Sequence, residues 1–281
     1  MQTHLECFPC FLRQTVIALR QRTDDQALQE EVIRAVLPLI HEADTTKPPA
    51  YTTTFIHRMI REKLRDDPFR EIKHEYNDIA LGLYPSLKER VKKSSDPLWT
   101  ASRLAIAGNV IDFGIFTSVD IEGSVGRSLA ASIAVDAYPA FREALETVDE
   151  VLYLLDNAGE IVFDRLFIEE LVSRGKKVKA VVKGSPVLND VTREDAAQTG
   201  LADQCDVIDN GSDGIGTIIE WTSPAFRREL DRAQLVISKG QGNFETLFGT
   251  DKRTFFLFQS KCEVVSKELG QSLGSMLFLS S

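Results

Sequence analysis

Short apolar runs recur in the second half of the sequence, and a glycine, asparagine or charged residue closely follows each of them. The runs cover residues 151–155, 178–182, 233–238 and 254–258. Continuous apolar runs of this length are typical of strands buried on both faces, as in a parallel sheet. Segments with helical spacing separate the first runs. The sequence therefore predicts an α/β fold with a Rossmann-like, mostly parallel sheet flanked by helices.

The first third of the chain has a different pattern. From Cys10 to about Lys93 the apolar residues recur at helical spacing, with little alternation typical of strands. Asp24 and Asp25 predict a helix cap, and Pro85 predicts the end of a later helix. We therefore predict an all-helical subdomain over residues 1–95 and an α/β domain over residues 96–281. A cleft between them is the expected site of function.

Charge and hydropathy restrict the partners of the chain. The 281 residues carry 33 Lys and Arg against 42 Asp and Glu, a net charge of −9, which disfavours binding to nucleic acid. No apolar stretch approaches the roughly 20 residues of a membrane helix, and the first residues do not resemble a signal peptide. The sequence predicts a cytoplasmic protein without a membrane partner, and it leaves the oligomeric state open. An anionic substrate would require a bound cation or focused lysines.

Oxygen-bearing side chains follow two of the predicted strands. Asp156 and Asn157 come directly after the first run, and Asp190 follows the second. Because the carboxyl ends of parallel strands meet at one edge of a sheet, we expect these side chains to lie together. Carboxylate and amide oxygens without a thiolate or imidazole suit Mg²⁺ or Mn²⁺ with open water positions. The three residues are our candidate metal ligands.

The third run is followed by a lysine and a glycine-rich segment. Lys239 precedes Gly240, and Asn243 lies three residues further on. Glycine lets backbone amides approach a phosphate, and a helix N-terminus adds positive potential. Lys239 and the backbone of residues 240–243 are therefore candidates for binding a phosphate.

Structural explanations exist for each motif taken alone. Asp156 and Asp190 could cap the helices that follow them, and residues 238–243 could form a plain glycine turn. An aspartyl-phosphate enzyme of the haloacid-dehalogenase type is an alternative, since residues 207–214 resemble its acidic loop. Asn157 and Ala158 do not provide the Asp-x-Asp that such an enzyme needs. No Walker loop or G-x-G-x-x-G turn is present, which excludes the common nucleotide-binding classes.

The four cysteines are too few and too scattered for a disulfide scaffold. Cys7 and Cys10 form a C-x-x-C pair, whereas Cys205 and Cys262 stand alone. The pair could be half of a metal site, a redox pair or two buried thiols, and the sequence leaves these possibilities open.

Several motifs together resemble the metal-dependent damage-control phosphatases, long known as domain of unknown function 89. The C-x-x-C start is similar to the compact archaeal and bacterial branch of that family, whose members have a helical N-terminal part beside a Rossmann-like sheet. The resemblance covers nearly the whole chain and is carried by residues 7–10, Asp67-Pro68-Phe69 with Lys73 and Asn77, and residues 107–112, 155–160, 188–192 and 239–243.

The resemblance implies roles for individual residues. Asp156, Asn157 and Asp190 match the family's metal ligands. Residues matching the substrate and phosphate pocket are Lys239, Asn109, Asp112 and Asn243. The implied activity is hydrolysis of phosphate monoesters of small metabolites, such as sugar phosphates or phosphopantetheine-like compounds. The implied cofactor is a divalent metal, and the open, oxygen-only ligand set favours Mn²⁺, Ni²⁺, Co²⁺ or Mg²⁺ over a closed zinc site. The metal would neutralise the phosphoryl oxygens together with Lys239 while water attacks in line. A phosphometabolite-binding protein without catalysis and a C-x-x-C interaction module are the alternatives.

Overall fold

The computed structural model describes residues 1–110 and 121–281. In the described residues, six helices precede the first strand along the chain. No helix in the described part of the chain is both long and apolar enough to cross a membrane. These six helices are α1 (Cys7–Arg22), α2 (Gln26–His41), α3 (Pro49–Leu64), α4 (Arg70–Lys92), α5 (Pro97–Val110) and α6 (Ile121–Ala130).

In the described part of the chain, seven strands form one sheet in the order β1-β7-β6-β5-β2-β3-β4. Strands β2 to β6 run parallel, whereas β7 pairs antiparallel with β6 and parallel with β1. This arrangement confirms the mostly parallel sheet. The strands are β1 (Ile133–Asp136), β2 (Glu150–Leu154), β3 (Lys177–Val182), β4 (Asp206–Asp209), β5 (Val236–Lys239), β6 (Thr254–Gln259) and β7 (Met276–Ser280).

Helices connect most of the successive strands. A helix follows β1, β2, β3, β5 and β6, and another lies between β4 and β5. Buried apolar residues from both faces of the sheet pack against these helices in two clusters. The connecting helices are α7 (Tyr138–Glu146), α8 (Glu160–Ser173), α9 (Arg193–Gln198), α10 (Pro224–Arg232), α11 (Gln241–Leu247) and α12 (Glu263–Glu268).

The chain changes direction across the sheet between β2 and β5. From β2 it moves outward to β3 and β4, and it then returns to the other side of β2 to form β5 and β6. The carboxyl ends of strands at such a reversal are the usual position for a ligand in this class of fold. A ligand-binding site is therefore expected at the residues that follow β2 and β5.

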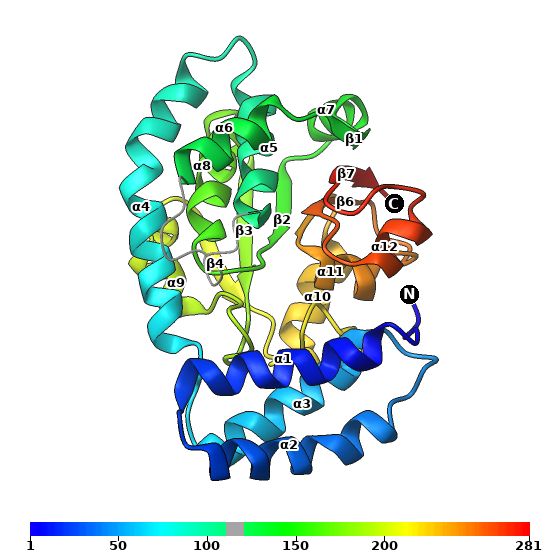
Figure 1. Ribbon diagram of the computed structural model, residues 1–281. Coiled ribbons are helices and arrows are strands. Elements are labelled where there is room, and N and C mark those ends of the chain that lie inside the picture. Colours follow the sequence, from blue (N-terminus) through cyan, green and yellow to red (C-terminus); the bar gives the residue numbers. More distant parts are fainter. Residues whose placement is uncertain (111–120) are drawn as a thin grey trace.

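Figure 1 shows α1, α2 and α3 packed together at one end of the molecule, with α4 running from them along the side of the sheet. Helices α1 to α3 have a buried core of their own. Helix α3 also contacts α11, and Thr54 accepts a hydrogen bond from the amide of Ile215 in the β4–α10 loop (3.0 Å). Helices α1 to α3 therefore lie at the carboxyl edge of the sheet.

The predicted helix boundaries are partly confirmed. Asp25 caps α2 by accepting hydrogen bonds from the amides of Ala27 and Leu28, as the sequence indicates. The prediction that a helix ends at Pro85 is wrong, because α4 continues through it to Lys92. Buried residues on both sides of Pro85 pack α4 into the same core as α8, which holds the helix together despite the missing amide donor. The division into two domains at residue 95 stays a prediction.

Candidate metal and phosphate site

The backbone joins the segments that follow β2 and β3. Asn157 and Asp190 form an isolated β-bridge. The amide of Val191 donates to the carbonyl of Asp156 (2.9 Å), and the amide of Ala158 donates to the carbonyl of Asn189 (2.8 Å). The structure thus brings together the three candidate metal ligands.

The two aspartates do not serve as helix caps. Helix α8 begins after Gly159, which provides no side-chain cap. Helix α9 is capped by Thr192, whose backbone and hydroxyl donate to Asp195. The carboxylates of Asp156 and Asp190 therefore remain available for another purpose.

Gly240 makes room for the Asp156 carboxylate. Its φ of 80° lies in the left-handed region, and a Cβ built on it would overlap with the carboxylate of Asp156. Only glycine fits both constraints without strain. We predicted from the sequence that Gly240 approaches a phosphate, whereas the structure places it against a candidate metal ligand.

Lys239 does not lie where the sequence analysis expects it. Its side chain is 0% exposed, and its ammonium donates to Glu160 Oε1 (2.5 Å), Asp164 Oδ1 (2.6 Å) and the carbonyl of Ala105 (2.9 Å). The lysine points between α5 and α8 rather than toward the open edge of the sheet. The expectation that it binds a substrate phosphate directly is therefore corrected, because three protein acceptors already surround its ammonium.

The predicted asparagines are also held by protein groups. Asn243 donates to the carbonyls of Leu155 (3.3 Å) and Lys239 (2.9 Å) and accepts from the hydroxyl of Thr217 (2.7 Å). Asn243 thus connects the ends of β2 and β5. Its side chain contacts protein groups rather than an open substrate pocket, so the expected substrate contact is corrected. Asp112 lies outside the described residues.

Asn109 and Asn157 both hold the carboxylate of Asp156. Their amide nitrogens lie 3.0 and 2.5 Å from Asp156 Oδ2. Both amides also donate to Glu160 Oε2, at 2.8 Å from Asn109 and 3.2 Å from Asn157. Glu160 is 1% exposed and connects this group to Lys239.

Sequence reasoning missed three charged residues around the site. Glu160 belongs to the motif of residues 155–160 after β2, but its contacts depend on the packing of α5 against α8, which brings Asn109 to it. Lys183 follows β3 directly, and its ammonium lies 3.3 Å from Asp190 Oδ2 while donating to the carbonyls of Gly214 and Gly216. Lys261 follows β6, and applying the strand-end rule to this fourth run would have found it.

Negative charge is in excess at this site. Among the described residues, five carboxylates (Asp156, Glu160, Asp164, Asp190 and Asp195) face the buried ammonium groups of Lys73, Lys183 and Lys239, and the exposed Lys261 also acts on Asp156. Burial, with the nearby carboxylates, raises the pKa of Asp156 well above its usual range. Burial also raises the pKa of Asp190 and brings that of Asp164 to about 7. A divalent cation would balance this excess.

The donors present fit a hard divalent cation with open water positions. Asp156, Asn157 and Asp190 supply oxygen, which Mg²⁺ and Mn²⁺ prefer. Within residues 1–110 and 121–281, no group of three or more His, Cys, Asp or Glu side chains is arranged to enclose a metal. Two carboxylates and one amide make an open set, which leaves room for water and substrate.

Other candidate groups of the sequence analysis lie elsewhere. The thiol of Cys7 is buried, which raises its pKa, and it accepts a hydrogen bond from the amide of His4 (3.4 Å). Asp213, in the acidic stretch after β4, is paired with Arg58 (2.6 Å) and Arg61 (2.5 Å) of α3. These ion pairs fix the β4–α10 loop to the helical part.

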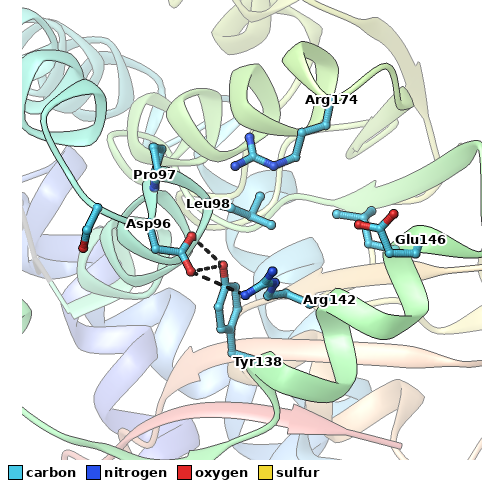
Figure 2. Close-up of a pocket in the computed structure, with 9 residues that line it drawn as sticks. Asp96, Pro97, Leu98, Tyr138, Arg142, Glu146 and Arg174 are labelled. Carbon is cyan, nitrogen blue, oxygen red and sulfur yellow. Dashed lines mark hydrogen bonds and ion pairs between the residues drawn. The ribbon is translucent and has the colours of Figure 1, made fainter.

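Figure 2 shows a cavity of about 260 Å³ whose lining residues do not include the candidate metal ligands. It is lined by Asp96, Tyr138, Arg142 and Arg174, among others, and the hydroxyl of Tyr138 donates to Asp96 (2.8 Å). Arg174 caps the end of α8, whereas Glu160 begins that helix. The cavity therefore opens at the opposite edge of the sheet from the candidate metal ligands.

Comparisons with known proteins identify the family of the chain. The damage-control phosphatase ARMT1-like domain matches residues 3–277. A damage-control phosphatase of Archaeoglobus fulgidus is 32% identical over an alignment of 279 positions that covers 96% of either chain. An uncharacterized protein of Methanocaldococcus jannaschii is 35% identical, covering 98% of this chain and 94% of its own.

A solved structure shares the whole fold. The crystal structure of a DUF89 family protein from Pyrococcus horikoshii superposes with a TM-score of 0.93 at 29% identity, covering 100% of this chain and 99% of its own. With a matching family domain over nearly the whole length and relatives above 30% identity, the chain belongs to the damage-control phosphatase ARMT1-like family.

Proposed function

We propose that this protein is a divalent-metal-dependent phosphatase that hydrolyses phosphate monoesters of small metabolites. Family membership supports the phosphatase activity. The observation that carries the metal dependence is the bridge between Asn157 and Asp190, which gathers three oxygen donors where the strand order reverses. Sugar phosphates and phosphopantetheine-like compounds are the proposed substrate classes.

Asp156, Asn157 and Asp190 would hold the cation. A bound divalent cation supplies charge neutralisation of the phosphoryl oxygens. The chain's own part is to keep these donors in place: two amides and the Gly240 backbone fix Asp156, and Lys183 lies beside Asp190. Preorganised charge of this kind is the main source of catalysis in phosphoryl transfer.

Lys261 is the proposed phosphate-binding cation in place of Lys239. Its side chain is exposed, and its charge lowers the pKa of Asp156, opposing the effect of burial. Its amide donates to the side chain of Gln241 (2.9 Å), which begins α11 directly after Gly240. This position puts an exposed ammonium on the same edge of the sheet as Asp156.

We expect Lys261→Ala to lower kcat/KM by about 10- to 100-fold, because a charge-assisted contact to a phosphoryl oxygen contributes roughly 1.5–3 kcal/mol. Steady-state kinetics on the best substrate measure the change. Lys267→Ala is the matched control, since this exposed lysine lies on α12. Equal kcat/KM values for the two variants would show that Lys261 does not contact the substrate phosphate.

Chelation tests the metal dependence. Protein dialysed against EDTA should release no phosphate from a panel of phosphometabolites, and added Mn²⁺, Ni²⁺, Co²⁺ or Mg²⁺ should restore the activity. The inactive protein should keep its native circular dichroism, because the fold has its own core. Undiminished turnover by protein shown to contain no metal would refute the proposal, and binding of a phosphometabolite without turnover would indicate a sensor.

A further inference from the structure

Glu160 lies among the candidate metal ligands, yet both of its oxygens are occupied. Oε1 accepts from the Lys239 ammonium (2.5 Å), and Oε2 accepts from the amides of Asn109 (2.8 Å) and Asn157 (3.2 Å). With the side chain 1% exposed, protein donors rather than solvent surround both oxygens. The role of Glu160 is therefore to be sought in these hydrogen bonds.

The hydrogen bonds of Glu160 determine which way the Asn157 amide points. The Asn157 nitrogen donates to Glu160 Oε2 and to Asp156 Oδ2 (2.5 Å). Because carboxylate oxygens only accept hydrogen bonds, they select the nitrogen and turn the amide oxygen away from themselves. An asparagine is useful to a cation only through that oxygen.

Lys239 fixes Glu160 in turn. The lysine is fully buried, and its ammonium also donates to Asp164, one turn further along α8, at 2.6 Å. The Tyr153 hydroxyl donates to the same Asp164 oxygen (2.7 Å). An ammonium has donors but no acceptor, so the residue at position 160 must offer it an oxygen.

We infer that Glu160, held by Lys239, is a positioning residue that orients the Asn157 amide so that its oxygen faces the cation. This inference rests on the proposed function, since it assumes that Asn157 is a metal ligand. Asn109 supports the same arrangement, because it donates to both carboxylates from the end of α5. The buried ion pair thus acts on the metal site without contacting substrate.

The inference predicts an unusual effect for Glu160→Gln. The introduced glutamine would turn its oxygen to Lys239 and its NH₂ group to Asn157. Position 160 would then favour the opposite orientation of the Asn157 amide, while Asp156 still selects the nitrogen. We expect Mn²⁺ to bind about 10- to 100-fold more weakly, as is common when a partner of a metal ligand is lost. Isothermal titration of the metal-free protein with Mn²⁺ measures this without any turnover.

A second substitution separates orientation from general disruption. In the double variant Glu160→Gln with Asn157→Asp, one oxygen of the introduced aspartate can accept from the introduced glutamine while the other faces the cation. Mn²⁺ affinity should therefore return to within about threefold of the unaltered protein. With Glu160 unaltered, Asn157→Asp instead removes a donor from two carboxylates. The change in Mn²⁺ affinity that Asn157→Asp causes should be at least about 10-fold less favourable with Glu160 unaltered than in the Glu160→Gln background. Equal effects in both backgrounds would overturn the inference.

The controls distinguish this inference from the proposed function. Glu169→Gln alters another glutamate on α8 that is bonded to Tyr84 and Arg165, and it should leave Mn²⁺ affinity unchanged. Asp156→Ala should abolish Mn²⁺ binding. If it does so while Glu160→Gln binds like the unaltered protein, the orienting role is refuted and the metal site stands; if Asp156→Ala binds normally, the proposed site itself fails.

A measurement on the unaltered, metal-free protein covers the case in which Glu160→Gln does not fold. Both hydrogens of the Asn157 NH₂ group should exchange slowly with solvent in ¹⁵N NMR spectra, because both are hydrogen-bonded to carboxylates. The absence of the signal pair in Asn157→Asp assigns it. Exchange at the rate of a solvent-exposed amide would contradict the inference.

Discussion

Asp156→Ala and Asp190→Ala should each lower kcat/KM by about 10³-fold or more, because each removes one of two carboxylates that would hold the cation. The fold should persist, since both residues follow their strands and neither caps a helix. Phosphate release with saturating Mn²⁺ measures the effect, and circular dichroism checks the fold. Asp156→Ala also relieves charge repulsion, so the stability of the metal-free protein should not fall greatly. Asp190→Ala should lower it more, because the buried Lys183 ammonium then keeps only its two carbonyl acceptors.

Asp209→Ala is the matched control for these variants. Asp209 ends β4 at the same edge of the sheet and pairs with Arg193 (2.9 Å), but it lies outside the group of candidate ligands. Its activity should stay within about threefold of the unaltered protein. A folded Asp156→Ala variant that is as active as Asp209→Ala would show that the carboxylate does not serve catalysis.

Lys239→Met should destabilise the protein by about 3–5 kcal/mol, because it leaves the buried carboxylates of Glu160 and Asp164 without their shared partner. Urea unfolding of metal-free protein measures the change. The exposed Lys261→Met should change stability by no more than about 0.5 kcal/mol. Equal stability of the two variants would mean that Lys239 is not the buried ion-pair partner described here.

The location of the site can be predicted from the sequence, because ligands in parallel α/β sheets bind beyond the carboxyl ends of the strands. Apolar runs identify β2, β3, β5 and β6, and parallel strands place the residues after their carboxyl ends at one edge of the sheet. Asp156, Asn157 and Asp190 could therefore be grouped in advance. Strands β1 and β4 have only four residues each and no long apolar run, so their sequence pattern did not reveal them.

The direction of individual side chains could not be predicted in the same way. Strand β5 is buried on both faces, so no alternation of polar and apolar residues indicates where Lys239 points. Its partners lie on α5 and α8, which pack together through contacts between distant parts of the sequence. The same packing brings Asn109 to Glu160. Such long-range contacts decide which lysine is buried and which one is exposed to substrate.

Anomalous diffraction from crystals soaked in Mn²⁺ would locate the bound cation. We expect a strong peak at about 2.1 Å from carboxylate oxygens of Asp156 and Asp190 and from the amide oxygen of Asn157. A peak confined to another part of the molecule, such as the Cys7 and Cys10 pair, or the absence of any peak in crystals of protein that binds Mn²⁺ in solution, would contradict this expectation.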